Sequence, residues 1–232
     1  MKTLFNVIAD FFLPSHCMCC KSAVEKGSLI CKECDKLLER TEKNLCVKCG
    51  LNKKKCACAG FVYHFSRITA PFYNKGVAQN GLYKMKFSGA KELSCFYGHA
   101  MSERVKRDFY DINFSKITYV PTGAIRELKR GYDQSRLLAE SISKEMGIEL
   151  EDSILRRTIF SRTQHKRKGV HIRFSNAYRN YYHRGKINGG NILLVDDIKT
   201  TGASLDACSR QLLLAGADEV FCVTALVSDK KS

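Results

Sequence analysis

The chain has 232 residues, which is more than a single average domain requires and enough for an α/β core with a smaller module attached. Its formal net charge of +16, from 39 Lys and Arg against 23 Asp and Glu, favours a polyanionic partner but indicates no particular fold. Nine of the 12 cysteines fall between residues 17 and 58, mostly as close pairs, which favours metal binding and argues against a disulfide scaffold.

The first predicted element is a helix over residues 3–13 that ends at Pro14. Asn6 and Asp10 interrupt its apolar residues, the segment is too short to span a bilayer, and no small-residue cleavage site follows it. Helices that lie on a membrane surface usually carry more Lys and Arg than the single Lys2 found here, so we favour packing against the protein itself. We accordingly expect a cytoplasmic protein. The apolar face comprises Leu4, Val7, Ile8, Phe11 and Phe12.

Eight cysteines then form four close pairs. A Cys-x₂-Cys pair places two thiolates within reach of one tetrahedral ion, and two pairs complete a Cys₄ zinc site. Eight ligands therefore suit two structural zinc ions without an open coordination position, and Cys19 is left over. The short loops favour sequential sites, although an interleaved arrangement would also satisfy the spacing. The eight ligands are Cys17, Cys20, Cys31, Cys34, Cys46, Cys49, Cys56 and Cys58.

The spacers between these pairs are short and polar, so they cannot form an apolar core without metal. We predict an amphipathic lead-in and a double zinc ribbon over residues 1–60, and a second domain over residues 61–232. Lys48 and the lysines at 53–55 suit nucleic-acid phosphates, since zinc ribbons often contact nucleic acid; the alternative is a merely solvated loop.

The middle of the chain alternates predicted strands and helices. Aromatic and aliphatic residues alternate within residues 60–73 and predict strands there. A further strand at 117–120 runs into Pro121, and Gly147 is suited to a left-handed helix cap. The predicted helices span 82–87, 90–107 and 135–146, with a connector at 109–114.

No acidic residue occurs between Asp152 and Asp196, whereas ten Lys or Arg and five aromatic residues do. Cations spaced along a backbone, interleaved with aromatic rings that can stack bases, are typical of proteins that bind single-stranded nucleic acid. The candidate nucleic-acid residues are Arg162, Lys166, Arg167, Lys168, Arg173, Tyr178 and Tyr181.

Residues 192–204 contain the most specific pattern. Four large aliphatic residues predict a strand buried on both faces, and a helix from Ala203 and a second strand at 219–225 follow it. A helix N-terminus preceded by small residues offers backbone N–H groups to a phosphate, and Gly202 allows a close approach. Asp196 and Asp197 are acceptors only, which suits vicinal hydroxyls or a hydrated Mg²⁺. The alternative is an ordinary helix with an acidic N-cap region.

The sequence VDDIKTTGAS at 195–204 closely resembles the 5-phosphoribosyl-1-pyrophosphate (PRPP) signature of type I phosphoribosyltransferases. The resemblance implies that Asp196 and Asp197 face the ribose hydroxyls, with Mg²⁺ accompanying PRPP. It also implies two phosphate-binding loops. The residues implied for the 5-phosphate are Lys199, Thr200, Thr201, Gly202, Ala203 and Ser204, and those for the pyrophosphate are Pro121, Thr122, Gly123, Arg126 and Arg130.

A double zinc ribbon ahead of such a core resembles the ComF family of competence proteins. The stretch RGYDQ at 130–134 is similar to the ComF motif RGxxQ, which commonly has Asn where this chain has Asp133, and Thr163-x-His165 is also similar to a ComF motif. The implied fold class is α/β, with a type I phosphoribosyltransferase-like, open, mainly parallel sheet. Helices cover both faces, and the small double zinc-ribbon module precedes the sheet.

Three functions remain open at this point. A ComF-like protein of DNA uptake would bind single-stranded DNA and carry the PRPP site. A phosphoribosyltransferase of nucleotide salvage would use the basic stretch at 153–195 as a flap over the pyrophosphate. A non-enzymatic partner of a DNA-translocating helicase would dock through its zinc ribbons. We expect no segment after the last predicted strand to recognise a nucleobase acceptor. Residues 61–90 could still cover one, but nothing in them identifies it, and we favour the first function.

Overall fold

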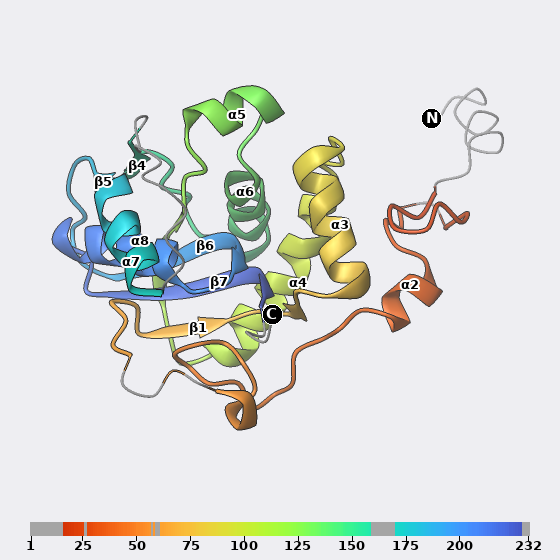
Figure 1. Cartoon of the computed structure of the whole chain (residues 1–232), viewed down its shortest axis with the longest axis horizontal. Coiled ribbons are helices and arrows are strands. Elements are labelled where there is room, and N and C mark those ends of the chain that lie inside the picture. The colour runs from red at the N-terminus through yellow and green to blue at the C-terminus, as the bar shows by residue number, and fades with distance from the viewer. Residues whose placement is uncertain (1–15, 26, 57, 59–60, 159–169, 229–232) are drawn as a thin grey trace.

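A parallel β-sheet forms the centre of the protein in our computed structural model, which describes residues 16–25, 27–56, 58, 61–158 and 170–228 (Figure 1). Strand β7 (Glu219–Val227) lies between β6 (Asn191–Lys199) and β1 (Arg67–Thr69), and β3 (Phe114–Tyr119) pairs with the other edge of β6. The short strand β2 (Phe72–Tyr73) also pairs with β7, and all of these pairings are parallel. The expected mainly parallel sheet is thus confirmed.

Helices cover both faces of this sheet because β6 and β7 are apolar on both faces. Leu193 and Val195 pack in one core cluster, and the alternate residues Ile192 and Leu194 pack in another. The first cluster includes residues of three helices: α3 (Gly76–Phe87), α4 (Leu93–Asp108) and α6 (Gln134–Met146). The second includes residues of α7 (Val170–Asn180) and α8 (Ala203–Leu214), with the antiparallel pair β4 (Leu155–Arg157) and β5 (Tyr181–His183).

The first cysteine segment lies against α3. It contains the short helix α2 (Lys32–Lys36), and the Lys84 ammonium of α3 donates to the carbonyls of Met18 and Cys19, each at 2.7 Å. The second segment contains the 3₁₀ turn η1 (Lys53–Lys55) and lies against the sheet. There the Ile68 N–H of β1 donates to the carbonyl of Val47 at 2.8 Å. Both segments therefore contact the α/β core directly, and the predicted boundary at residue 60 stays a prediction.

Several element boundaries differ from those expected. The strand predicted at 192–195 continues to Lys199, so Asp196 and Asp197 belong to β6. Helix α3 begins at Gly76 rather than at residue 82, and the connector expected at 109–114 gives its last residue, Phe114, to β3. Helix α6 with Gly147 in the left-handed conformation is as predicted. The helix expected at 3–13 lies outside the described residues, and no described helix is both long enough and apolar enough to cross a membrane.

Candidate functional sites

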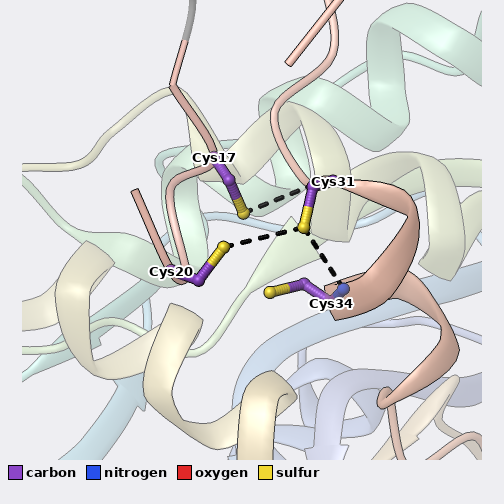
Figure 2. A group of neighbouring side chains, drawn as sticks. All are labelled: Cys17, Cys20, Cys31 and Cys34. Atoms are coloured by element: carbon purple, nitrogen blue, oxygen red, sulfur yellow. Dashed lines mark hydrogen bonds between the residues drawn. The ribbon is translucent and has the colours of Figure 1, made fainter. Parts of the chain in front are cut away.

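Two groups of four cysteines each bring their sulfur atoms together. Within each group the Sγ atoms lie within 4.8 Å of one another. The groups are sequential, which confirms the favoured pairing: Cys17, Cys20, Cys31 and Cys34 form the first, and Cys46, Cys49, Cys56 and Cys58 form the second. Figure 2 shows the first group, in which the four sulfurs converge between the segment at 17–20 and the start of α2.

Backbone donors support the first group. The N–H groups of Cys19 and Cys31 lie 3.4 and 3.3 Å from Cys17 Sγ, and the N–H of Cys34 lies 3.3 Å from Cys31 Sγ. Such donors stabilise thiolates, but four thiolates this close repel one another unless a cation lies between them. Four sulfur ligands suit zinc, and together they fill its tetrahedral coordination and leave no position open. Both groups therefore fit structural zinc.

A polar cavity of about 200 Å³ lies where β3 and β6 end at their carboxyl edge. Ligands bind at this edge in open parallel sheets. Pro121 and Thr122 follow β3 and line the cavity from one side, and Asp196 and Asp197 line it from β6. Its charged lining combines these two carboxylates with four cations: Lys86, Arg126, Arg130 and Arg157.

The two aspartates have different partners. Lys86 Nζ lies 2.6 Å from Asp197 Oδ2, whereas Asp196 Oδ1 accepts from Ser135 Oγ at 3.0 Å and from the Asp197 N–H at 2.9 Å. Burial, together with the neighbouring charge of Asp197, raises the pKa of Asp196 to about 8. Burial thus favours the protonated form of Asp196, whereas Asp197 has an ammonium partner.

The loop after β3 is held by Asp133. This carboxylate accepts from the Thr122 N–H at 2.6 Å and the Thr122 hydroxyl at 3.0 Å, and it also caps α6 by accepting from the Ser135 N–H at 2.9 Å. Burial raises the pKa of Asp133 despite these donors. From the other side, Arg157 Nη1 donates to the Thr122 carbonyl at 3.1 Å. Asp133 thus holds the loop after β3 against the start of α6.

Two residues of RGYDQ, Arg130 and Gln134, line the cavity. Arg130 is the last residue of the short helix α5 (Ala124–Arg130), and Gly131 caps that helix with a φ of 76°. The guanidinium of Arg130 donates to Gln134 Oε1 at 2.7 Å, and both side chains line the cavity. Gly123 precedes α5 with a φ of 96°, which explains glycine at this position of the predicted pyrophosphate loop.

The loop from Thr200 to Ser204 surrounds a smaller adjoining cavity of about 40 Å³. Gly202 has a φ of 84° directly before α8, and the Ala203 N–H lies 3.3 Å from Thr201 Oγ1. Lys199 also lines this cavity. Its buried ammonium donates to the carbonyl of Cys49 at 2.7 Å, so this side chain connects the loop to the second cysteine group.

The predicted nucleic-acid residues are only partly placed. Arg162, Lys166, Arg167 and Lys168 lie outside the described residues, and Arg173 is exposed on α7. Tyr178 is half-buried and donates to Asp206. The prediction for Tyr181 must be corrected: β5 packs against α8, so the side chain is only 5% exposed. It lies beside Arg157 and lines the polar cavity instead of presenting an open ring to a strand.

Four polar residues of the cavity lining were missed by sequence reasoning: Lys86, Gln134, Ser135 and Arg157. Gln134 belonged to a motif already noted, and Arg157 to the acid-free stretch, so each carried a local signal. Lys86 carried none, because nothing in the pattern of α3 indicates that its side chain reaches β6.

Comparisons with known proteins agree with this architecture. A family profile described as a double zinc ribbon domain matches residues 8–61. DNA utilization protein YhgH of Escherichia coli K12 is 24% identical over 222 residues, covering 91% of this chain and 97% of that protein. Competence protein ComFC of Streptococcus pneumoniae is 26% identical over 202 residues, covering 83% of this chain and 85% of that protein.

Among solved structures, adenine phosphoribosyltransferase from Thermoanaerobacter pseudethanolicus is 11% identical with a TM-score of 0.35, over 62% of this chain and 83% of that chain. This match is too distant to support any argument, so the assignment rests on the sheet, its loops and the cysteine groups. These features define a phosphoribosyltransferase-like domain joined to a double zinc ribbon. The ribbon profile and the two relatives, matched over most of their length, support a ComF-family protein.

Proposed function

We propose that this protein acts in DNA uptake, binds single-stranded DNA in the cytoplasm, and binds PRPP with Mg²⁺ in the cavity between β3 and β6. The observation that carries the PRPP proposal is the meeting of two carboxylates, four cations and a helix N-terminus around connected polar cavities. The role in DNA uptake is inferred from the relatives named for competence and DNA utilization.

Each part of PRPP has a chemically suited partner. Asp196 and Asp197 are acceptors for ribose hydroxyls, and their oxygens are also the ligand type that Mg²⁺ prefers. The N–H groups at the start of α8, with the hydroxyls of Thr200, Thr201 and Ser204, suit a 5-phosphate. The guanidinium groups of Arg126, Arg130 and Arg157 suit the pyrophosphate because they offer several N–H donors to phosphate oxygens.

Calorimetry with PRPP and Mg²⁺ tests this site. Asp197→Ala and Thr201→Val should each weaken binding by about 1.5–3 kcal/mol, because each removes a hydrogen bond to a charged or hydroxyl-rich ligand. Unchanged affinity in both variants would rule out the site. Incubation of the protein and PRPP with a panel of nucleobase acceptors separates binding alone from transferase activity, which would release pyrophosphate from C1 of the ribose.

The DNA proposal rests on the acid-free stretch at 153–195. If about five phosphates are neutralised, a plot of the logarithm of affinity against the logarithm of salt concentration should have a slope of about −3.5. Changing Arg167 and Lys168 to Ala should make this slope shallower by roughly one unit or more. If the stretch is a flap for PRPP, the same double variant should impair PRPP binding and leave DNA affinity intact. Fluorescence anisotropy of a labelled single strand, with and without PRPP and Mg²⁺, decides between these outcomes.

Docking of a DNA-translocating helicase on the zinc ribbons is the second candidate. The observation in its favour is that Leu37 and Val47, which belong to the two cysteine segments, are exposed apolar residues. A pull-down of the helicase with Leu37→Ser and Val47→Ser tests it. Capture that equals that of the unmodified protein would exclude these residues as the docking surface.

A further inference from the structure

An exposed aromatic ring lies beside the cavity and has no role in the function proposed above. Phe87, the last residue of α3, is 70% exposed, although phenylalanine is among the residues most often buried. Tyr83, one turn earlier on the same helix, is 42% exposed, and the two ring centroids are 6.1 Å apart. Helix α3 therefore carries two neighbouring aromatic rings that the described part of the chain leaves accessible.

Two contacts connect Phe87 to the cavity. The guanidinium carbon of Arg130 lies 5.0 Å from the centroid of the Phe87 ring, and Arg130 itself lines the cavity. Lys86, the residue directly before Phe87, also lines the cavity and reaches Asp197. In Figure 1, α3 and α5 both lie on the upper side of the molecule, and the contact between Phe87 and Arg130 joins their carboxyl ends. Phe87 therefore lies at the rim of the cavity.

This arrangement suits a nucleobase that is joined to a phosphate. An accessible ring gives a base a surface for stacking, and a neighbouring guanidinium adds a planar cation that stacks on bases as well. The cations of the cavity then lie close enough to attract the phosphate of the same ligand. An apolar protein segment would use the ring but would gain nothing from the cations beside it.

We propose that Phe87, with Arg130, is a stacking platform for a nucleobase at the rim of the PRPP cavity. The inference rests on the proposed function and names the ligand class that this site receives next to PRPP. The base can belong to a free nucleotide or to a single strand, and both share the chemistry of an aromatic ring joined to a phosphate.

The absence of tryptophan from the sequence allows a direct test. The substitution Phe87→Trp introduces the protein's sole indole, and its fluorescence should be quenched when a base stacks on it. Tyr110→Trp is a matched control, because Tyr110 is an 84% exposed aromatic residue in the turn after α4 and does not line the cavity. Each variant is titrated with a single-stranded oligonucleotide, with adenosine 5′-phosphate, and with an abasic strand that has phosphates but no bases.

We expect quenching of the Phe87→Trp indole by the base-containing ligands, and no quenching by the abasic strand or in the Tyr110→Trp control. Quenching by adenosine 5′-phosphate alone would identify a free nucleotide, and quenching by the oligonucleotide alone would identify a strand. Phe87→Leu, which keeps an apolar side chain, should weaken binding of that ligand about tenfold.

Other outcomes would overturn the inference. Anisotropy can show that the unmodified protein binds the strand while no ligand changes the indole fluorescence of Phe87→Trp. In that case the stacking platform is wrong and the proposed function stands. Equal quenching by the abasic strand would show that phosphates, not bases, approach the ring. If neither PRPP nor the strand binds the unmodified protein, the proposed function fails. Only the titration with adenosine 5′-phosphate then tests the inference. Unchanged indole fluorescence in that titration would overturn it and point to a protein partner.

Discussion

Lys86 Nζ and Asp197 Oδ2 lie 2.6 Å apart in an ion pair whose two side chains are mostly buried. Lys86 comes from α3 and Asp197 from β6, so the pair ties a helix on one face of the sheet to the proposed ribose site. The ammonium neutralises one of two adjacent carboxylates that would otherwise repel each other. A ligand whose hydroxyls bind Asp197 can share this carboxylate with the ammonium, because a carboxylate accepts several hydrogen bonds, and the ammonium then lies close to the ligand's phosphates.

Replacing Lys86 by Met should therefore weaken PRPP binding. The change keeps the length of the side chain but removes a cation from a cavity that we propose for a polyanionic ligand. We expect a loss of affinity of about tenfold or more, equivalent to a charge-assisted hydrogen bond of about 1.5–3 kcal/mol. Calorimetry with PRPP and Mg²⁺ measures it.

Lys91→Met provides the matched control for that experiment. Lys91 lies above the Tyr132 ring at 4.7 Å, close to the same helix, but it does not line the cavity. Its loss should leave PRPP affinity within about twofold of the unmodified protein, since only distant and screened electrostatics change. Equal losses of PRPP affinity in both variants would show that Lys86 acts only through its contribution to the net charge.

The pKa of Asp196 predicts a dependence of stability on pH. Burial and the charge of Asp197 raise this pKa to about 8, whereas the pKa of an aspartate in the unfolded chain is about 3.9. Between these values the folded protein retains a proton that the unfolded chain has released. The free energy of unfolding should therefore fall as pH rises through this range, by at most about 1.4 kcal/mol per pH unit from this group.

Asp196→Asn cannot ionise, yet its side-chain oxygen can still accept from Ser135 and from the Asp197 N–H. We expect the variant to melt higher relative to the unmodified protein at pH 8 than at pH 5. Thermal melts at both pH values, without ligand, measure the difference. Parallel melting-temperature curves for the two proteins would contradict the raised pKa.

Local patterns in the sequence predicted the parts of the site that depend on local geometry. The Cys-x₂-Cys spacing predicted two sequential cysteine groups, and the run from Ile192 to Ser204 predicted the strand, loop and helix. Contacts between distant segments were not predictable. The pattern around Tyr181 indicates an accessible ring among cations, but pairing of β5 with β4 and packing on α8 bury it. Likewise, nothing local indicates that Lys199 reaches Cys49.

Asp206 also makes long-range contacts that the sequence did not indicate. This buried carboxylate in the first turn of α8 accepts from the His64 N–H at 2.6 Å and from the Tyr178 hydroxyl. Asp206→Ala removes the shared acceptor of those donors, so we expect it to lower the free energy of unfolding by about 1–3 kcal/mol. Asp206→Asn retains one acceptor oxygen and should cost less. Urea denaturation measures both, and equal losses would mean that the charge, rather than the hydrogen bonds, stabilises this contact.

The Lys199 contact predicts that the second cysteine group, but not the first, supports PRPP binding. Lys199 directly precedes Thr200, and its buried ammonium is held by the Cys49 carbonyl at 2.7 Å. Loss of zinc from the second group should release this carbonyl and allow the phosphate loop to shift. The first group instead contacts α3, through the Lys84 ammonium.

Cys56→Ser and Cys31→Ser separate the two groups, since each removes one ligand from one of them. Metal analysis should show the zinc content falling from about two to about one per chain in both variants. PRPP affinity should then fall about fivefold or more in Cys56→Ser alone, a coupling of about 1–3 kcal/mol between the metal site and the loop. Lys199→Met should reproduce that loss with both zinc ions retained, because it breaks the contact without touching a ligand. If all three variants bind PRPP as tightly as the unmodified protein does, the second ribbon does not position the loop.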